Sequence, residues 1–365
     1  MKQNKQDKKN QKVIIAMSGG IDSSVAAALL KQKGFEVIGA FMNLWEEDKK
    51  KSIEAKERAR KVAKILEIPF CVFDLEKEFK EKIVNYFLED YKKGITPNPC
   101  VLCNKEIKFG LFAKRAFALG ADFVATGHYA RIRKFVNSKQ IRYSLISSKD
   151  KNKDQSYFLW MLNQEQLRRV LFPVGNYTKQ EAKKLAKKFK LPVFDAPESE
   201  EICFVQGALK SENNLSAIND FLKRYLKPKP GKIVDQKGNV LGKHEGLCFY
   251  TIGQRKGIKL PQGPFFVLDK DPKRNFLIVT KDEKDLYKNE LVAENINWIS
   301  GKAPKLPFKA KAKIRYRHEA AEAVIKNFHK NKIKVIFKTP QRAITPGQSV
   351  VFYKSQEVLG GGTIV

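Results

Sequence analysis

The first third of the chain alternates short apolar runs with longer segments of helical periodicity. Apolar runs of strand length occupy residues 13–17, 35–42, 70–75 and 123–126. Between them, the spacing of apolar residues predicts helices over residues 24–31, 52–66, 76–93 and 104–119. Strands separated by helices of this length form parallel βαβ units. The pattern therefore predicts an α/β domain with a doubly wound parallel sheet, whose ligands bind at the carboxyl ends of the strands.

The pattern changes after Tyr129. Residues 130–135 and 140–146 alternate around a polar turn and predict a β-hairpin, and helical segments follow at 155–162 and 179–189. From about Lys227, short strands alternate with turn signals, and proline-lysine runs at 227–230 and 303–307 mark joints. We therefore expect a disordered basic tail (1–12), an α/β domain (13–226), a central β-rich module (227–285) and a C-terminal β-barrel (286–365).

Composition excludes several classes of protein. The chain has 365 residues, of which 42% are hydrophobic and 30% charged, and no apolar run approaches the roughly 18 residues of a membrane span. The basic tail lacks the apolar segment of a secretory signal. Five cysteines, an odd number, in a chain without a signal are typical of a reducing cytoplasm, where paired cysteines are more often catalytic or metal-binding than structural.

The net charge is strongly positive. Lys and Arg number 71 against 39 Asp and Glu, which gives a formal charge of +32. Such a surface attracts polyanions through counterion release, so nucleic acid is the natural partner. The other source of the excess is a genome rich in A and T, which favours lysine codons. The charge alone therefore identifies no site.

A glycine-rich loop, Ser-Gly-Gly-Ile-Asp-Ser at residues 18–23, lies between the first predicted strand and the first predicted helix. Outward-facing N–H groups and the helix dipole make such a turn a phosphate cradle. It lacks the lysine of a Walker A motif and the spacing of GxGxxG. It resembles the pyrophosphate loop of ATP pyrophosphatases; the alternative is an ordinary tight turn. The predicted ATP contacts are Ala16, Met17, Ser18, Gly19, Gly20, Ile21, Asp22, Ser23, Met42 and Gly127.

Three cysteines are candidates for chemistry. Cys100 and Cys103 follow a Thr-Pro-Asn-Pro segment and precede a helix predicted to begin at Asn104. The helix dipole, with Lys105 and Lys108 nearby, predicts a low pKa for the Cys103 thiol. Cys203 lies in a short apolar patch after an acidic run and is of interest only if it meets Cys103 in space. We expect structural roles for Cys71, Cys248, His244 and His329.

A basic stretch in the C-terminal region alternates with apolar residues. As a strand, residues 311–317 carry Lys311, Lys313, Arg315 and Arg317 on one face. Such a row can bind phosphates, and Tyr316 can stack on a base if its side of the sheet is exposed. The alternative is an edge strand that carries lysine to prevent aggregation.

Six motifs together resemble one family. They are SGGxDSSV, NPxxxCNxxIKF, ATGHYAR, KDQSYFL, an ICF segment and GLxxYTIGQRKG, in this order over most of the chain. They are similar to the bacterial tRNA-specific 2-thiouridylases, the MnmA family, whose catalytic domain has an adenine nucleotide alpha hydrolase-like fold. The resemblance implies ATP-dependent 2-thiolation of the wobble uridine of tRNA. The uracil C2 oxygen is adenylated, persulfide sulfur is transferred to C2, and AMP and pyrophosphate leave, with Mg²⁺ and Asp22 positioning the phosphates.

The resemblance also implies roles for the cysteines. Cys203 matches the cysteine that carries the persulfide, and Cys103 the nucleophile that ends in a transient Cys103–Cys203 disulfide. Some family members carry Asp at the position of Cys100. A second possibility therefore stays open, in which Cys100, Cys103 and Cys203 bind a [4Fe-4S] cluster with one open iron. Zinc would need a second cysteine or histidine pair at suitable spacing, which is missing.

The same resemblance implies contacts with RNA. Asn98, Pro99 and Cys100 match the residues that touch the target base, and His128, Lys153, Asp154, Gln155, Arg315, Tyr316 and Gln348 match residues that contact tRNA. The implied partners are the tRNAs for Lys, Glu and Gln and a sulfur donor, either a cysteine desulfurase or a relay protein. Two other functions remain as alternatives: a different pyrophosphate-loop ligase, and a non-catalytic RNA-binding protein.

Overall fold

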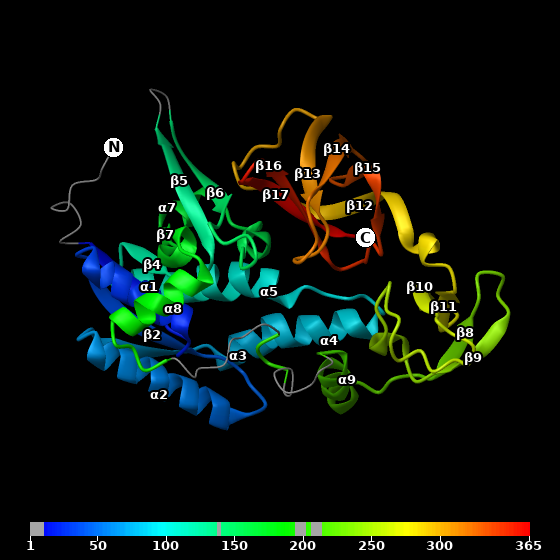
Figure 1. Cartoon of the computed structure of the whole chain (residues 1–365), viewed down its shortest axis with the longest axis horizontal. Helices are drawn as coiled ribbons and strands as arrows, with labels where there is room; N and C mark the ends of the chain where they lie inside the picture. Colours follow the sequence, from blue (N-terminus) through cyan, green and yellow to red (C-terminus); the bar gives the residue numbers. More distant parts are fainter. Residues whose placement is uncertain (1–10, 137–139, 194–201, 206–213) are drawn as a thin grey trace.

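The computed structural model of the chain describes residues 11–136, 140–193, 202–205 and 214–365. Three parts follow one another: a parallel α/β domain, a small mixed sheet and an antiparallel barrel (Figure 1). The predicted fold class is therefore confirmed. The predicted tail lies mostly outside the described residues, and Lys12 already belongs to the first strand.

The N-terminal sheet has five parallel strands in the order β3-β2-β1-β4-β7. They are β1 (Lys12–Ala16), β2 (Glu36–Asn43), β3 (Phe70–Asp74), β4 (Phe123–Ala125) and β7 (Val170–Leu171). The first four match the predicted strands, whereas β7 is too short to leave a pattern. The chain moves to one side of β1 with β2 and to the other side with β4. The loop that follows β1 thus lies at the topological switch point, where α/β sheets bind their ligands.

Helices connect and cover these strands. They are α1 (Ile21–Gln32), α2 (Lys49–Ile65), α3 (Glu76–Phe79), η2 (Lys80–Val84), α4 (Asn85–Lys92), α5 (Pro99–Leu102), η3 (Cys103–Phe112), α6 (Ala113–Ala118), η4 (Ser156–Leu159), α7 (Gln164–Arg168), η5 (Pro173–Asn176), α8 (Lys179–Lys188) and α9 (Asn214–Tyr225). Two predictions need correction. The helix expected from Asn104 begins earlier, at Pro99, because proline suits the first helical position. The segment expected to be helical over 155–162 forms only the short 3₁₀ helix η4.

The central module is a four-stranded mixed sheet in the order β10-β11-β8-β9. Its strands are β8 (Gly231–Val234), β9 (Val240–His244), β10 (Phe266–Asp271) and β11 (Phe276–Thr280), and η6 (Leu247–Phe249) follows β9. Buried Leu247, Cys248 and Phe249 pack into the same hydrophobic cluster as the α/β domain. The module is therefore tied to the first domain by a shared core.

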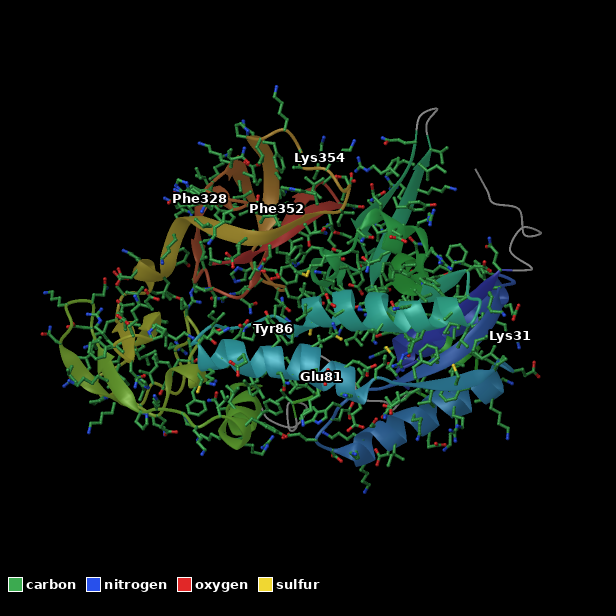
Figure 2. All side chains as sticks on the ribbon, turned by 180° about the vertical axis from the view of Figure 1, so that it is seen from behind. Lys31, Glu81, Tyr86, Phe328, Phe352 and Lys354 are labelled. Carbon is green, nitrogen blue, oxygen red and sulfur yellow. The ribbon has the colours of Figure 1, made fainter. Side chains whose placement is uncertain are left out.

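The C-terminal barrel consists of six antiparallel strands, and pairing between β12 and β17 closes it. The strands are β12 (Tyr287–Trp298), β13 (Phe308–Lys313), β14 (Ala321–Asn327), β15 (Ile333–Arg342), β16 (Ser349–Lys354) and β17 (Glu357–Ile364), and η7 (Glu283–Leu286) precedes them. Inside the barrel, Phe352 stacks on Trp298 with ring centroids 5.6 Å apart, whereas Phe328 is exposed at the surface (Figure 2).

The predicted hairpin exists as β5 (Ala130–Val136) and β6 (Ile141–Ser147). Unexpectedly, β6 pairs with β17, so a hairpin of the α/β domain extends the sheet of the barrel (Figure 1). The predicted basic strand over residues 311–317 is wrong in its second half. Strand β13 ends at Lys313, and the chain turns at Ile314, so Arg315 and Arg317 do not continue the row of Lys311 and Lys313.

No helix within the described part of the chain is long and apolar enough to span a membrane.

Candidate active site

The loop at residues 18–23 connects β1 to α1, and its shape is fixed locally. The backbone of Gly19 has φ +76°, and a Cβ there would lie 2.3 Å from the carbonyl oxygen of Ala55 in α2. The Ser23 hydroxyl accepts a hydrogen bond from Ser18 N (3.2 Å), and the Ser24 hydroxyl donates to Gly20 O (2.8 Å). These contacts hold the loop open at the N-terminus of α1, where N–H groups lack intrahelical partners.

Two strand ends lie at the edge that carries this loop. A Cβ on Gly127, just after β4, would lie 2.6 Å from Ser23 N and 2.8 Å from Asp22 C, so this position requires glycine. Met42 lies at the carboxyl end of β2, beside the end of β1, where Met17 N donates to Ala40 O. The loop and Gly127 are therefore in direct contact, and Met42 lies on the neighbouring strand. Their contact with ATP stays a prediction.

Asp22 is the acidic residue of the loop, and a cation from a distant helix binds it. Lys179 Nζ lies 2.8 and 2.9 Å from the two carboxylate oxygens, and the Tyr129 hydroxyl donates to the first of them (2.8 Å). The Lys179 side chain is only 12% exposed. Both carboxylate oxygens of Asp22 therefore bind Lys179, and one of them also binds Tyr129.

The sequence did not reveal Lys179, which lies 157 residues beyond Asp22. The only local signal is Thr178 with Glu181, a capping box that fixes the start of α8. A capping box predicts where a helix begins. It does not predict what the helix faces.

Cys103 begins the π-helical segment η3 and is buried, with 6% of its surface exposed. It packs in the same core cluster as Phe204. The Phe204 ring lies between Phe79 and Phe87, at centroid distances of 5.8 and 5.2 Å. This anchor leaves the adjoining Cys203 exposed. The apolar residues after Cys203 therefore fix its backbone in the core while its side chain remains accessible.

The three cysteines interact electrostatically. Burial raises the pKa of Cys103 to about 11, and the neighbouring Cys100 raises it further. The pKa of Cys100 also rises to about 11, through burial and then through Cys203. The pKa of Cys203 is raised by desolvation and by Cys103. Because the Cys203 side chain is exposed and keeps part of its hydration, we expect a smaller rise there than at Cys103.

These pKa values correct one prediction. Cys103 was expected at a helix N-terminus with a low pKa, but the helix begins at Pro99 and desolvation outweighs the attraction of Lys108. Lys108 lowers the pKa of all three thiols and that of His128, whereas Lys105 pairs with Glu106 (3.8 Å). In this conformation the thiols are protonated at neutral pH.

Glu46 is a second residue that sequence analysis did not single out. It follows β2, beside a cavity of about 140 Å³ that Asn43, Ser52 and Lys56 also line. Burial raises the pKa of Glu46 to about 7, against an opposing effect of Lys51. Its charge raises the pKa of Cys203, so the carboxyl lies close to that thiol. Nothing in the spacing of the sequence connects these two residues.

The cysteines do not form a metal centre in this conformation. The structure pairs none of the five in a disulfide. Among the residues that the structure describes, no group of three or more His, Cys, Asp and Glu side chains is arranged to hold a metal ion. Cys100, Cys103 and Cys203 therefore do not fit a [4Fe-4S] cluster as they stand.

The segment before Cys100 makes contacts with the barrel. Gln348 Nε2 donates to Thr96 O (2.9 Å) and Pro97 O (3.1 Å), and the Asn98 side chain hydrogen-bonds the Tyr157 hydroxyl. Gln348, expected to contact tRNA, thus contacts the chain itself. Its role toward tRNA stays a prediction.

The KDQ segment and His128 also have partners within the chain. Asp154 accepts hydrogen bonds from Ser148 N (2.9 Å) and from the Ser156 hydroxyl (2.9 Å), and Gln155 accepts one from Tyr129 N (2.9 Å). Lys153 N donates to Asp150 (3.3 Å). His128 is buried at the end of β4, where Nδ1 lies 2.7 Å from the Thr126 hydroxyl. Burial, followed by Lys108, holds its pKa well below the usual range, so the ring is neutral.

Arg315 and Tyr316 face inward from the turn after β13. Arg315 Nη2 donates to Ala343 O (2.5 Å) and to the Thr345 hydroxyl (2.8 Å). Tyr316 packs on Phe158, with ring centroids 4.5 Å apart. The surface expected to grip RNA is therefore partly used for internal packing, and its binding to tRNA stays a prediction.

Comparison with known proteins gives three family models along the chain. The tRNA methyl transferase HUP domain matches residues 11–207, the tRNA methyl transferase PRC-barrel domain residues 219–281, and the aminomethyltransferase beta-barrel domain residues 288–364. Their order agrees with the three parts of the fold. The first match covers more than half of the chain.

Curated relatives match over nearly their whole length. The chain is 48% identical over 367 residues to tRNA-specific 2-thiouridylase MnmA 2 of Thermoanaerobacter sp. (strain X514), covering 97% of this chain and 98% of the relative. It is 46% identical over 365 residues to tRNA-specific 2-thiouridylase MnmA of Clostridioides difficile (strain 630), with the same coverage.

A solved structure, the U34-tRNA thiolase NcsA from Methanococcus maripaludis with its [4Fe-4S] cluster, is 21% identical over 60% of this chain and 68% of its own. Its TM-score of 0.37 is too low to support an inference. The curated relatives and the family models are sufficient without it: the chain belongs to the tRNA-specific 2-thiouridylase MnmA family.

Proposed function

We propose that this chain uses ATP to replace the C2 oxygen of the wobble uridine of tRNA with sulfur. The observation that carries the proposal is the meeting of Cys100, Cys103 and Cys203, which shift one another's pKa. This group lies close to a phosphate loop. Lys108 acts on the cysteines and on His128, and the adjoining Gly127 packs on the loop. These contacts support a site in which adenylation and sulfur transfer take place side by side.

The first step activates a poor leaving group. The uracil C2 oxygen attacks the α-phosphorus of ATP, the bond to pyrophosphate breaks, and the oxygen becomes part of AMP. The loop N–H groups at the start of α1 bind the departing phosphates. We expect ATP to enter as its Mg²⁺ complex. Lys179, which binds Asp22 at 2.8 Å, supplies the cation that the loop itself lacks.

The second step delivers sulfur. The terminal sulfur of a persulfide on Cys203 attacks C2, and AMP leaves with the former uracil oxygen. The Cys103 thiolate then attacks Sγ of Cys203 and breaks the sulfur–sulfur bond, so that one sulfur stays on C2. A disulfide between Cys103 and Cys203 results, and an external thiol supplies two electrons to reduce it. Accessible Cys203 suits a residue that must be reloaded by a donor protein.

The burial of Cys103 and the exposure of Cys203 agree with these reaction steps. Cys103 is protected by burial, which keeps its pKa near 11 and its thiol unreactive until substrate is bound. Glu46, whose pKa is raised to about 7, acts electrostatically on Cys203 and is the proposed proton acceptor near neutral pH. We assign no step to an iron–sulfur cluster, since the cysteines do not fit one in this conformation.

The partners follow from the reaction. Uracil must leave its stack to reach the site, and Asn98, Pro99 and Cys100 are the proposed contacts of the flipped base. The net charge of +32 supports tRNA as the substrate. We propose the tRNAs for Lys, Glu and Gln as substrates, a cysteine desulfurase or relay protein as sulfur donor, and the cytoplasm as the location.

The test is mass spectrometry of tRNA from a strain without this gene, with and without a plasmid that expresses the chain. We expect 2-thiouridine to be absent without the plasmid and restored with it. Equal 2-thiouridine in both strains would overturn the proposal. Iron and sulfide analysis after anaerobic purification is expected to give substoichiometric iron, and one cluster per chain would replace the persulfide route.

A further inference from the structure

The connection between β15 and β16, residues 343–348, together with Ser349 at the start of β16, lies against both other parts of the molecule. We call it the barrel loop. Thr345, in the connection, and Ser349, the first residue of β16, are 2% and 3% exposed. Loops normally run over the surface because their backbone needs polar partners. Burial of this loop therefore means that other parts of the chain satisfy it.

Its main contact is with the segment that leads into the cysteine helix. Gln348 Nε2 donates to the carbonyl oxygens of Thr96 (2.9 Å) and Pro97 (3.1 Å), and Thr96 N donates back to Pro346 O (3.3 Å). Helix α5, with Cys100 in its first turn, begins directly after this segment at Pro99. In Figure 1 the segment crosses between the barrel and α4.

The approach is close enough to require glycine. Gly347 has φ +88°, and a Cβ there would lie 2.3 Å from Ile95 Cγ2 and 2.7 Å from Thr96 O. The amide of Gln348 and the missing Cβ of Gly347 thus both allow the loop to contact residues 95–97. A bulky residue at position 347 would push residues 95–96 away from the barrel.

A second connection reaches the proposed base contact. The buried Tyr157 hydroxyl donates to Ser349 O (2.9 Å) and also hydrogen-bonds the Asn98 side chain. Asn98 precedes α5 but makes no capping hydrogen bond with its side chain, which is directed to Tyr157 instead. The barrel loop therefore fixes both the backbone before α5 and the amide of Asn98.

The far side of the loop is tied to the rest of the molecule. Arg315 donates to the Thr345 hydroxyl (2.8 Å) and to Ile252 O of the central module (3.4 Å). The Thr251 hydroxyl lies 3.3 Å from the Thr96 hydroxyl. The barrel loop and the central module thus hold the Thr96 segment from two sides.

We propose that Gln348 is a positioning residue, through which the C-terminal barrel sets the position of Asn98 and of the helix that carries Cys100 and Cys103. The proposal rests on the proposed function for its consequences in catalysis, but the positioning itself is a property of the free protein. Gln348 then positions the cysteine helix through the Thr96 segment. Its loss should lower the rate of the reaction more than the affinity for tRNA.

The test compares Gln348→Ala with wild type in two measurements. In the free protein, pulsed alkylation with iodoacetamide is followed by mass spectrometry of the tryptic peptide of residues 94–105, which contains Cys100 and Cys103. Release of the segment is expected to raise the alkylation rate of Cys103 about threefold or more, since local opening exposes buried thiols. In the thiolation assay, kcat is expected to fall about tenfold with little change in KM for tRNA.

Gln341→Ala is the matched control. Gln341 lies near the end of β15, the strand that leads into the barrel loop, and its Nε2 donates to Thr339 O (2.8 Å) and Pro340 O (3.3 Å) of its own strand. We expect wild-type alkylation and kcat from this variant. Gln348→Glu, which keeps the shape but removes the donor, is expected to behave like Gln348→Ala or worse.

The opposite pattern would overturn the proposal. If Gln348→Ala leaves Cys103 alkylation and kcat unchanged and raises KM for tRNA, Gln348 is an RNA contact. Gly347→Ala provides an independent variant and is expected to expose Cys103 in the same way. Because alkylation needs neither ATP nor tRNA, failure of the proposed function would leave this result intact and would appear separately, as absent thiolation in wild type.

Discussion

The phosphate loop and the cysteine site are built in different ways. The loop takes its shape from six consecutive residues, two glycines, and hydroxyl contacts within five positions of one another. The cysteine site brings together residues from η3, from the segment around Cys203 and from the end of β2, and the barrel fixes its entry. A local motif is visible in sequence, whereas an assembled site depends on the tertiary structure.

The two sites also differ in electrostatics. The loop has N–H groups without intrahelical partners at a helix N-terminus, which favour an anion, and the ion pair of Asp22 with Lys179 lies beside it. The cysteine site disfavours the thiolate form, because desolvation raises the pKa of Cys103 to about 11. One site is preorganised in the free protein, and the other needs substrate, or a movement, to become reactive.

The largest expected effect is the loss of thiolation without loss of pyrophosphate release. Cys103→Ser and Cys203→Ser should each lower thiolation by at least about 10³-fold, since the thiol that forms or resolves the persulfide is lost. Release of pyrophosphate from ATP in the presence of unmodified tRNA should continue, because the loop is unchanged. Thiolation is measured by mass spectrometry of tRNA, and pyrophosphate by a coupled assay.

Cys71→Ser is the control, since Cys71 lies in β3, where its thiol donates to the Gly39 carbonyl oxygen at 3.7 Å and does not act on the other cysteines' pKa values. Full activity is expected from it. Full thiolation by Cys103→Ser and Cys203→Ser would instead favour another type of pyrophosphate-loop ligase, which needs no cysteine pair.

A smaller effect tests whether the loop is as local as its sequence suggests. Lys179→Ala should lower kcat/KM for ATP about 10²-fold, because the Asp22 carboxylate loses its ion pair and its negative charge is then unpaired beside the phosphates. Steady-state pyrophosphate release measures this. Lys187→Ala, exposed on the same helix, should behave like wild type. Equal kinetics for the two variants would mean that the loop binds ATP without help from α8.

The sequence predicted what depends on neighbouring residues. Four of the strands, the hairpin and the loop follow from apolar runs and glycines, and the order of the three parts follows from the change in pattern. The predictions that were wrong concern residues whose contacts are distant in the sequence. Strand β13 ends at Lys313, and the following Arg315 turns inward to bind the carbonyl oxygen of Ala343. No local pattern contains that contact.

The candidate site divides in the same way. The cysteines could be named from motifs, but their pKa values could not, since burial outweighs the helix dipole and Lys108. Glu46 and Lys179 gave no signal because their partners are far away along the chain. Gln348 was expected to contact RNA, and only the fold reveals its bonds to Thr96 and Pro97.

The smallest expected effect concerns which lysine lowers the pKa of Cys103. Lys108 lowers the pKa of Cys103, so Lys108→Gln should raise that pKa and reduce the thiolate fraction at fixed pH. An interaction of about 1 kcal/mol corresponds to a rate of Cys103 alkylation about fivefold lower at pH 8.5. In wild type, the rate of Cys103 alkylation should rise with pH up to about 11. In Lys108→Gln, the same rise should occur at higher pH.

Lys105→Gln is the matched control for this last comparison, because Lys105 lies nearer to Cys103 in sequence but pairs with Glu106 at 3.8 Å. Its alkylation profile should coincide with that of wild type. A larger effect at Lys105 than at Lys108 would mean that sequence proximity, rather than the fold, determines the charge at Cys103. The cysteine site would then be as local as the phosphate loop, and the contrast between the two sites would be lost.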